Sequence, residues 1–192
     1  MTQQKKNAIS VDVEDWFQVS AFENSVDRKD WDSLPHRVEA NTMRLLELFA
    51  EHDTKATFFT LGWVAERYPA LVRRMVEEGH EVASHGMTHT RVTEQTPDVF
   101  LADIVAAKKL LEDVSGSAVT GYRAASYSIG RDNLWALEKL EEAGYGYSSS
   151  IVPIKHDLYG MPEAPRFAFT PDNAPGLLEV PVTTVQLGEK NY

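Results

Sequence analysis

The chain of 192 residues contains no cysteine. This absence excludes disulfides, cysteine-ligated zinc and a cysteine nucleophile. The sequence also lacks an apolar run long enough to span a bilayer, and its polar start, Met1–Asn7, shows no apolar segment ahead of a small-residue cleavage site. We therefore expect a cytoplasmic protein that does not insert into a membrane.

Several common site motifs are also missing. No glycine-rich phosphate loop, dinucleotide-binding loop or serine-hydrolase elbow is present. Positive charge is scarce, with a formal net charge of −10. An acidic chain offers no electrostatic surface for nucleic acid or anionic lipid. A neutral or cationic sugar chain is compatible with this charge.

The composition is that of a globular protein, with 43% hydrophobic and 25% charged residues. The length indicates one domain over residues 1–192. Apolar and β-branched patterns predict strands, here given by residue number: 8–13, 55–60, 80–84, 119–123, 145–151, 177–182 and 183–187. Helical spacing predicts helices over residues 35–52, 69–78, 97–114 and 132–143. A proline-rich irregular loop is expected over residues 153–176.

Strands that alternate with helices indicate an α/β fold built from βα units around a parallel sheet. Polar clusters follow several of the predicted strands. The carboxyl ends of parallel strands meet at one edge of a sheet, where α/β proteins build their sites. We therefore expect these clusters to meet in the folded chain.

The first cluster is Ser-His-Gly-Met-Thr-His, which spans residues 84–89. His85 and His89 are four residues apart, so on a helix or tight turn both imidazoles can bind one metal ion. The alternative is that they are two unrelated histidines. Gly86 occupies the position of the glutamate of a zinc-protease motif, which disfavours that class.

The second cluster follows the first predicted strand and holds Asp12, Glu14 and Asp15. In an extended strand Asp12 and Glu14 point to one face and Asp15 to the other. Three neighbouring carboxylates repel one another unless a cation lies among them or one stays protonated. The alternative is a solvated strand end with acidic residues that cap a helix.

The third cluster is Gly-Tyr-Arg-Ala-Ala-Ser-Tyr-Ser, which spans residues 121–128. Its Arg123 follows a predicted strand. A guanidinium group beside a carboxylate can orient that carboxylate and keep it ionised. An arginine with a purely structural role at the surface is the alternative.

Together these clusters resemble the polysaccharide deacetylase family (NodB homology, carbohydrate esterase family 4). The acidic, histidine and arginine motifs stand in the family's order, and residues 55–89 resemble its central stretch throughout. The segment Ile-Ser-Val-Asp-Val-Glu-Asp-Trp-Phe-Gln-Val resembles the branch found beside exopolysaccharide export and exosortase genes. The resemblance implies a distorted (β/α) barrel with fewer than eight strands, which this chain leaves incomplete at its C-terminus.

The resemblance also implies a metal-dependent hydrolase that removes acetyl groups from N-acetylated sugars of a polysaccharide. Asp12 would be the general base, and Arg123 would hold it in place. His85 and His89 would bind the metal together with one carboxylate, for which Asp15 is preferred and Glu14 is the rival. Zinc is the favoured ion, and cobalt, nickel and iron also suit such a ligand set.

Trp16 adjoins the acidic cluster, and we expect it, together with Tyr127, to contact the substrate. The resemblance implies that the backbone N–H of Tyr127 or a neighbour stabilises the oxyanion. The family's late histidine, which protonates the leaving amine, has only His156 as a counterpart. Three alternatives therefore stay open: an amidase acting on a cyclic amide, an O-acetyl esterase, and a degenerate domain that only binds metal or glycan.

Overall fold

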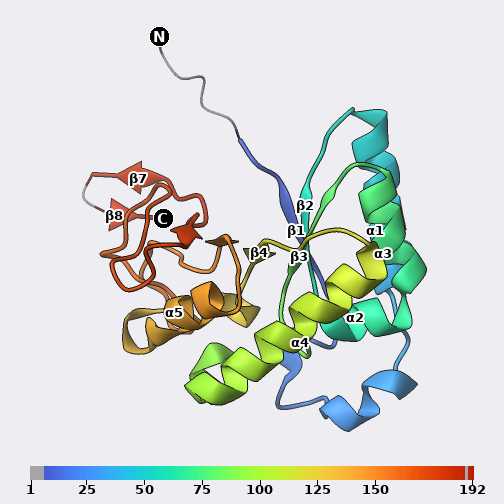
Figure 1. Ribbon diagram of the computed structural model, residues 1–192, viewed down its shortest axis with the longest axis horizontal. Helices are drawn as coiled ribbons and strands as arrows, with labels where there is room; N and C mark the ends of the chain where they lie inside the picture. The colour runs from blue at the N-terminus through green and yellow to red at the C-terminus, as the bar shows by residue number, and fades with distance from the viewer. Residues whose placement is uncertain (1–6, 189) are drawn as a thin grey trace.

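The computed structural model describes residues 7–188 and 190–192; residues 1–6 of the polar N-terminal segment lie outside this range (Figure 1). Its main sheet has six parallel strands in chain order. They are β1 (Ser10–Val13), β2 (Thr57–Thr60), β3 (Glu81–Ser84), β4 (Gly121–Tyr122), β5 (Tyr147–Ser148) and β6 (Leu178–Glu179). The predicted α/β fold with a parallel sheet is confirmed.

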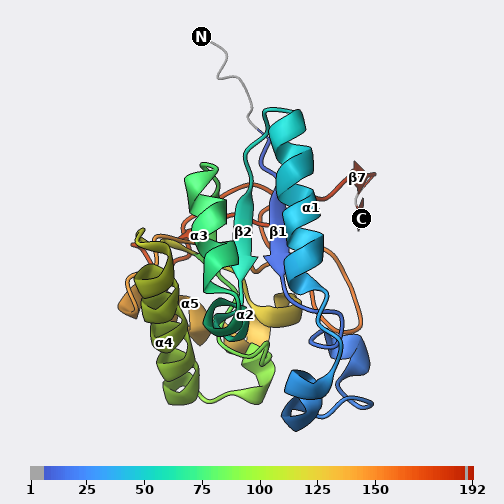
Figure 2. The same cartoon turned by 90° about the vertical axis from the view of Figure 1, so that its right-hand side faces the viewer.

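Five α-helices connect the strands. They are α1 (Val38–Glu51), α2 (Gly62–Arg67), α3 (Pro69–Glu77), α4 (Pro97–Ser115) and α5 (Trp135–Glu142). Short 3₁₀ turns cover Ser20–Phe22, Arg28–Ser33, Val92–Glu94, Ala125–Tyr127 and Arg131–Asn133. Helices α1 and α3 lie on one side of β1, β2 and β3, as Figures 1 and 2 show. None of the described helices is long and apolar enough to cross a membrane.

Successive side chains of β1 and β2 point to opposite faces of the sheet, so one face packs into the apolar core and the other carries the candidate site. Val13 on β1 and Phe58 on β2 are fully buried in the apolar cluster beneath the helices. Their neighbours Asp12 and Phe59, which pair with each other in the β1–β2 register, contact Arg123 instead. The face of the sheet that turns away from α1 and α3 therefore carries the polar residues.

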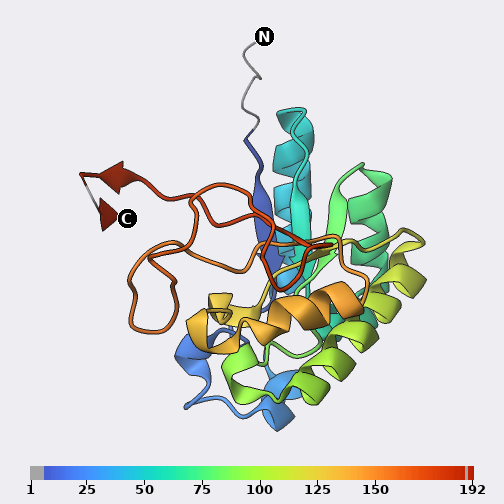
Figure 3. The same cartoon turned by 60° about the vertical axis from the view of Figure 1, so that its left-hand side comes forward.

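The sequential order of parallel strands is that of a (β/α) barrel, in which each strand pairs with the next. Within the described residues, no pairing joins β6 back to β1. The chain from residue 149 onward is mostly irregular and lies on the opposite side of β1–β3 from α1 and α3 (Figures 1 and 3). The sheet is therefore an open portion of a barrel.

Several element boundaries differ from those predicted. Helix α2 was not predicted, because six residues give too few turns for a periodic pattern. The predicted helix over residues 132–143 begins as a 3₁₀ turn, and α5 follows it. The predicted strand over residues 183–187 forms only at Gln186–Leu187 (β7), which pairs with Lys190–Asn191 (β8) in a separate antiparallel hairpin.

His80, just before β3, is a histidine held neutral within the fold. Its side chain is buried against the rings of Phe58 and Phe49. The Nδ1 atom accepts a hydrogen bond of 3.2 Å from the N–H of Ala56. Burial, followed by the positive charge of Lys55, lowers the pKa of His80. Protonation of His80 is therefore opposed in the folded state.

This lowered pKa predicts a pH-dependent contribution to stability. The unfolded chain binds a proton at His80 more readily, so the contribution is complete above about pH 6.5 and is lost as the pH falls. We expect the difference in unfolding free energy between wild type and His80→Leu to shrink between pH 7.5 and pH 5.5, as measured by urea denaturation. The exposed His52, changed to Leu, is the control for the loss of a histidine outside the core. An equal difference for His80→Leu at both pH values would contradict the assignment.

Candidate metal centre and catalytic residues

Three ligand-type side chains meet where β1 and β3 end. Glu14 follows β1, and His85 and His89 follow β3. Their nearest ligand atoms lie within 4.8 Å of one another. The Nε2 atom of His89 is 2.9 Å from Oε2 of Glu14, and that of His85 is 3.9 Å from it. Both histidines are buried.

One oxygen of the Glu14 carboxylate is buried without a hydrogen bond. Its Oε2 atom is buried and has no hydrogen-bond partner among the described residues, although His89 Nε2 is close to it. An unpaired buried carboxylate oxygen is unfavourable. Two imidazole nitrogens and one carboxylate oxygen that face a common point fit a divalent cation such as Zn²⁺.

The orientation of His85 favours metal binding. Its Nδ1 atom lies 2.8 Å from the backbone carbonyl oxygen of Arg123. Because a carbonyl oxygen only accepts, Nδ1 carries the hydrogen and Nε2 presents its lone pair toward Glu14. Burial lowers the pKa of His85, which keeps the ring neutral.

The loop that carries His85 and His89 is held by the start of α2. The N–H groups of Gly62 and Trp63 donate to the carbonyl oxygens of Gly86 and Met87, both at 2.9 Å. Gly86 has a φ of 79°, and His89 itself adopts a φ of 54°. A left-handed conformation is unfavourable for histidine, so the surrounding contacts must hold it.

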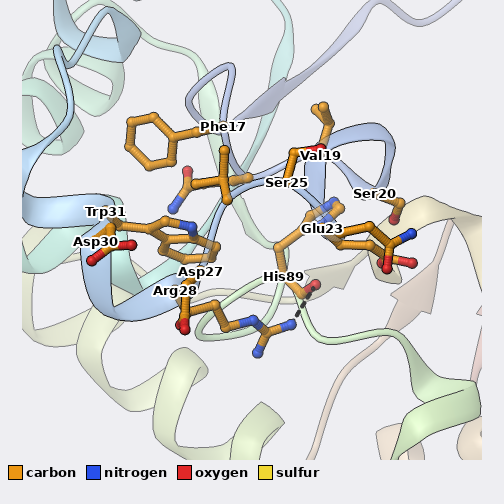
Figure 4. A pocket seen from close by; sticks show the side chains of 13 residues that line it. Phe17, Val19, Ser20, Glu23, Ser25, Asp27, Arg28, Asp30, Trp31 and His89 are labelled. Atoms are coloured by element: carbon orange, nitrogen blue, oxygen red, sulfur yellow. Dashed lines mark hydrogen bonds between the residues drawn. The ribbon is translucent and has the colours of Figure 1, made fainter.

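Arg28, in the loop between β1 and α1, supplies one of these contacts. Its guanidinium donates to Thr90 Oγ1 at 2.5 Å and to the carbonyl oxygen of His89 at 3.5 Å. The second contact is the dashed line in Figure 4. Beside it lies a cavity of about 530 Å³, whose lining includes Trp31 and His89. Glu23, Asp27 and Asp30 also line this cavity; Glu23 pairs with Arg91 and Asp27 with Lys29.

Asp12 and Arg123 form an ion pair on the same face of the sheet. Nη1 of Arg123 lies 2.7 Å from Oδ1 of Asp12. Nη2 donates to Ser10 Oγ at 2.9 Å and to Ser149 Oγ at 3.1 Å, while Nε donates to the Ser149 carbonyl oxygen at 3.1 Å. The guanidinium carbon lies 4.0 Å from the centre of the Phe59 ring. Arg123 is therefore held on all sides and orients Asp12.

The structure places Asp15 away from the histidines. Its side chain is 1% exposed, and Oδ2 accepts hydrogen bonds from the N–H groups of Arg37 at 2.7 Å and Val38 at 3.0 Å. These are the first free N–H groups of α1, so Asp15 caps that helix. The preferred metal carboxylate of the sequence analysis is therefore engaged elsewhere, and its rival Glu14 occupies the position beside the histidines.

Trp16, which was expected to contact the substrate, packs against the segment that leads into α1. The indole N–H of Trp16 donates to the carbonyl oxygen of Pro35 at 3.0 Å, and Arg37 lies over its ring at 5.6 Å. Trp16 thus joins β1 to the start of α1. Trp31, not Trp16, lines the cavity beside His89 (Figure 4).

Tyr127 lies near the ion pair, with its ring centre 5.5 Å from the Arg123 guanidinium carbon. Burial, followed by the charge of Asp12, raises the pKa of Tyr127. Its backbone N–H donates to the Ala124 carbonyl oxygen at 3.0 Å, so this group is not free to bind an oxyanion. His156 stacks on Tyr159 at 4.0 Å, and Tyr159 in turn contacts Tyr127.

Comparison with known families identifies the family of this chain. The sequence profile described as polysaccharide deacetylase matches residues 30–147, which is more than half of the chain. The chain therefore belongs to the polysaccharide deacetylase family, as its motifs predict. Residues 149–192 match a second profile, described only as a domain of unknown function.

Two curated relatives are similar in sequence. A chitooligosaccharide deacetylase of Bradyrhizobium sp. is 34% identical over 88 residues, which cover 46% of this chain and 40% of the relative. A peptidoglycan-N-acetylglucosamine deacetylase of Bacillus cereus is 31% identical over 99 residues, which cover 51% and 36%. The chain thus spans well under half the length of these relatives.

Solved structures show the same fold. A protein of Mycobacterium smegmatis, assigned as a polysaccharide deacetylase, superposes with a TM-score of 0.71 at 24% identity, over 92% of this chain and 58% of that one. An allantoinase gives a TM-score of 0.66 at 19% identity, over 92% and 61%. A pseudoenzyme of carbohydrate esterase family 4 from Bacillus anthracis gives 0.57 at 19% identity, over 73% and 41%. At these identities the similarity concerns the fold alone.

The different positions of Glu14 and Asp15 predict opposite effects of two mutations. Glu14→Ala removes a candidate ligand, and we expect it to weaken zinc binding more than about 100-fold without loss of stability. Asp15→Ala leaves buried N–H groups unpaired, and we expect it to lower the free energy of unfolding by about 2 kcal/mol while zinc binding persists. Calorimetric zinc titration and urea denaturation of the metal-free proteins measure the two effects. Loss of zinc binding in a folded Asp15→Ala protein would restore Asp15 as the ligand.

Proposed function

We propose that this chain is a metal-dependent deacetylase domain that removes acetyl groups from N-acetylated sugars of a glycan. The observation that carries the proposal is the buried Glu14–His85–His89 cluster beside the Asp12–Arg123 ion pair. Both stand at the carboxyl ends of β1, β3 and β4, parallel strands of one sheet, where this fold builds its sites.

Glu14, His85 and His89 would hold the metal ion. Their donor set suits Zn²⁺, and cobalt, nickel or iron would also fit it. When bound, the ion supplies a Lewis acid for the acetyl carbonyl group and favours ionisation of water. The neutral Nε2 atom of His85 and the unpaired Oε2 atom of Glu14 support this assignment.

The protein's own residues would handle the proton and the substrate. Asp12 would accept the proton of the attacking water as general base. Arg123 would orient the Asp12 carboxylate, since its guanidinium is fixed by Ser10 and Ser149. The cavity next to His89 would hold the sugar, with Trp31 in its wall.

Charge supports an amino sugar as the substrate. Removal of an acetyl group converts a neutral amide into an amine, which is protonated at neutral pH. Three carboxylates, of Glu23, Asp27 and Asp30, and one guanidinium, of Arg28, line the cavity, and this excess of negative charge is compatible with a cationic or neutral sugar. The relatives from Bradyrhizobium and Bacillus cereus are named as deacetylases of chitooligosaccharide and of peptidoglycan N-acetylglucosamine.

The proposal predicts that metal binding and turnover can be separated by mutation. We expect His85→Ala and His89→Ala to lose both bound zinc and acetate release from chitooligosaccharides. Asp12→Asn should keep its zinc and lose activity by about 100-fold or more, because only the base is removed. The exposed His52, changed to Ala, is the matched control and should behave as wild type. Elemental analysis and an acetate assay on the same samples provide the measurements.

Other outcomes would point to other functions. Zinc binding without acetate release, but with hydrolysis of a cyclic amide such as allantoin, would favour an amidase, the activity named for one protein with the same fold. Acetate release from acetylated xylan alone would favour an O-acetyl esterase. Zinc binding without any turnover would leave a binding domain. A wild-type protein that binds no zinc would contradict the proposal.

A further inference from the structure

Residues 149–192 match the profile of a domain of unknown function. Ser149, the first residue of this segment, contacts Arg123 of the candidate site. Ser149 accepts two of its hydrogen bonds: Nε of Arg123 donates to the Ser149 carbonyl oxygen and Nη2 to its Oγ, each at 3.1 Å. The N–H of Ala124, the next residue, donates to Ser150 Oγ at 3.0 Å. This segment therefore forms one wall around Arg123.

Residues 149–151 belong to no helix or strand, so individual hydrogen bonds determine their conformation. Ser149 N–H donates to the Tyr122 carbonyl oxygen at 2.9 Å. The next two N–H groups, of Ser150 and Ile151, both donate to Oε1 of Glu179, at 2.9 and 2.8 Å. One carboxylate oxygen thus fixes two successive peptide groups beside the arginine.

Glu179 is an unusual residue for such a position. It is the last residue of β6, in an otherwise apolar segment, and its side chain is 0% exposed. Burial raises the pKa of Glu179, while the Ser148 hydroxyl and then the N–H groups of Ile151 and Ser150 oppose that rise. A buried carboxyl group is costly unless its hydrogen bonds are satisfied. Its Oε2 atom has no hydrogen-bond partner among the described residues, so the two bonds that Oε1 accepts from residues 150 and 151 are what this carboxylate contributes.

We propose that Glu179 is a positioning residue, which fixes residues 149–151 so that Ser149 holds the Arg123 guanidinium against Asp12. The proposal gives a role to the segment of unknown function: it completes the environment of an arginine that the polysaccharide deacetylase segment provides. The catalytic part of this role rests on the proposed deacetylase function, whereas the effect on Arg123 does not.

The effect on Arg123 can be measured without any substrate. The Nε–H of Arg123 is buried and bonded to Ser149, so it should exchange slowly with solvent in proton–nitrogen NMR spectra. We expect Glu179→Ala to accelerate this exchange at least about tenfold. Glu179→Asp keeps the charge but has a side chain that is one methylene shorter, and it should also accelerate exchange. This variant serves as the test if the alanine variant fails to fold. Glu179→Gln retains the accepting oxygen and should restore most of the protection.

Glu141 offers a matched control. Its Oε1 also accepts from a backbone N–H of the same segment, that of Gly176 at 2.8 Å, but it contacts neither Arg123 nor Ser149 in the described structure. Glu141→Ala and Glu141→Asp should leave the exchange of the Arg123 Nε–H unchanged. Unchanged exchange in folded Glu179→Ala and Glu179→Asp would overturn the proposal.

Kinetics then test the consequence for catalysis. We expect Glu179→Asp to lower kcat about tenfold with little change in KM or in zinc content, because Arg123 acts on Asp12 and not on the sugar or the metal. Faster exchange with an unchanged kcat would overturn the catalytic role. A wild-type chain that releases no acetate would contradict the deacetylase function alone, and the exchange measurements would still decide whether Glu179 positions Arg123.

Discussion

Arg123 contacts both parts of the candidate site, the proposed base Asp12 and the proposed metal ligand His85. Its guanidinium binds the carboxylate of Asp12, and its backbone carbonyl oxygen orients the ring of His85. A small displacement of β4 would therefore disturb the proposed base and the proposed metal ligand together. This dependence explains why so many contacts from Ser10, Phe59 and Ser149 surround a single guanidinium.

The acidic cluster after β1 shows how like charges can be accommodated at one strand end. Asp12 pairs with the cation Arg123, and Glu14 faces two histidines. Asp15 points the other way and accepts the free N–H groups at the start of α1, where a negative charge is favourable. The three carboxylates therefore face three different groups, although they are neighbours in the sequence.

The later part of the chain depends on tertiary contacts to a greater degree. Strands β4, β5 and β6 have only two residues each. After β5, most of the described residues belong to no helix or strand. Such a segment takes its conformation from specific hydrogen bonds, as at Glu179, more than from repeating backbone structure.

The sequence by itself determined the α/β order, the main helices and the motifs that place the chain in its family, because apolar periodicity and motif spacing are local properties. It also restricted the site to Asp12, the Glu14–Asp15 pair, His85, His89 and Arg123. Only the tertiary structure placed Glu14, and not Asp15, beside the two histidines, since the N–H groups that occupy Asp15 lie 22 and 23 residues further along the chain. The same reason applies to Trp16, Ser149 and Glu179: their partners are distant in sequence, and no local pattern records them.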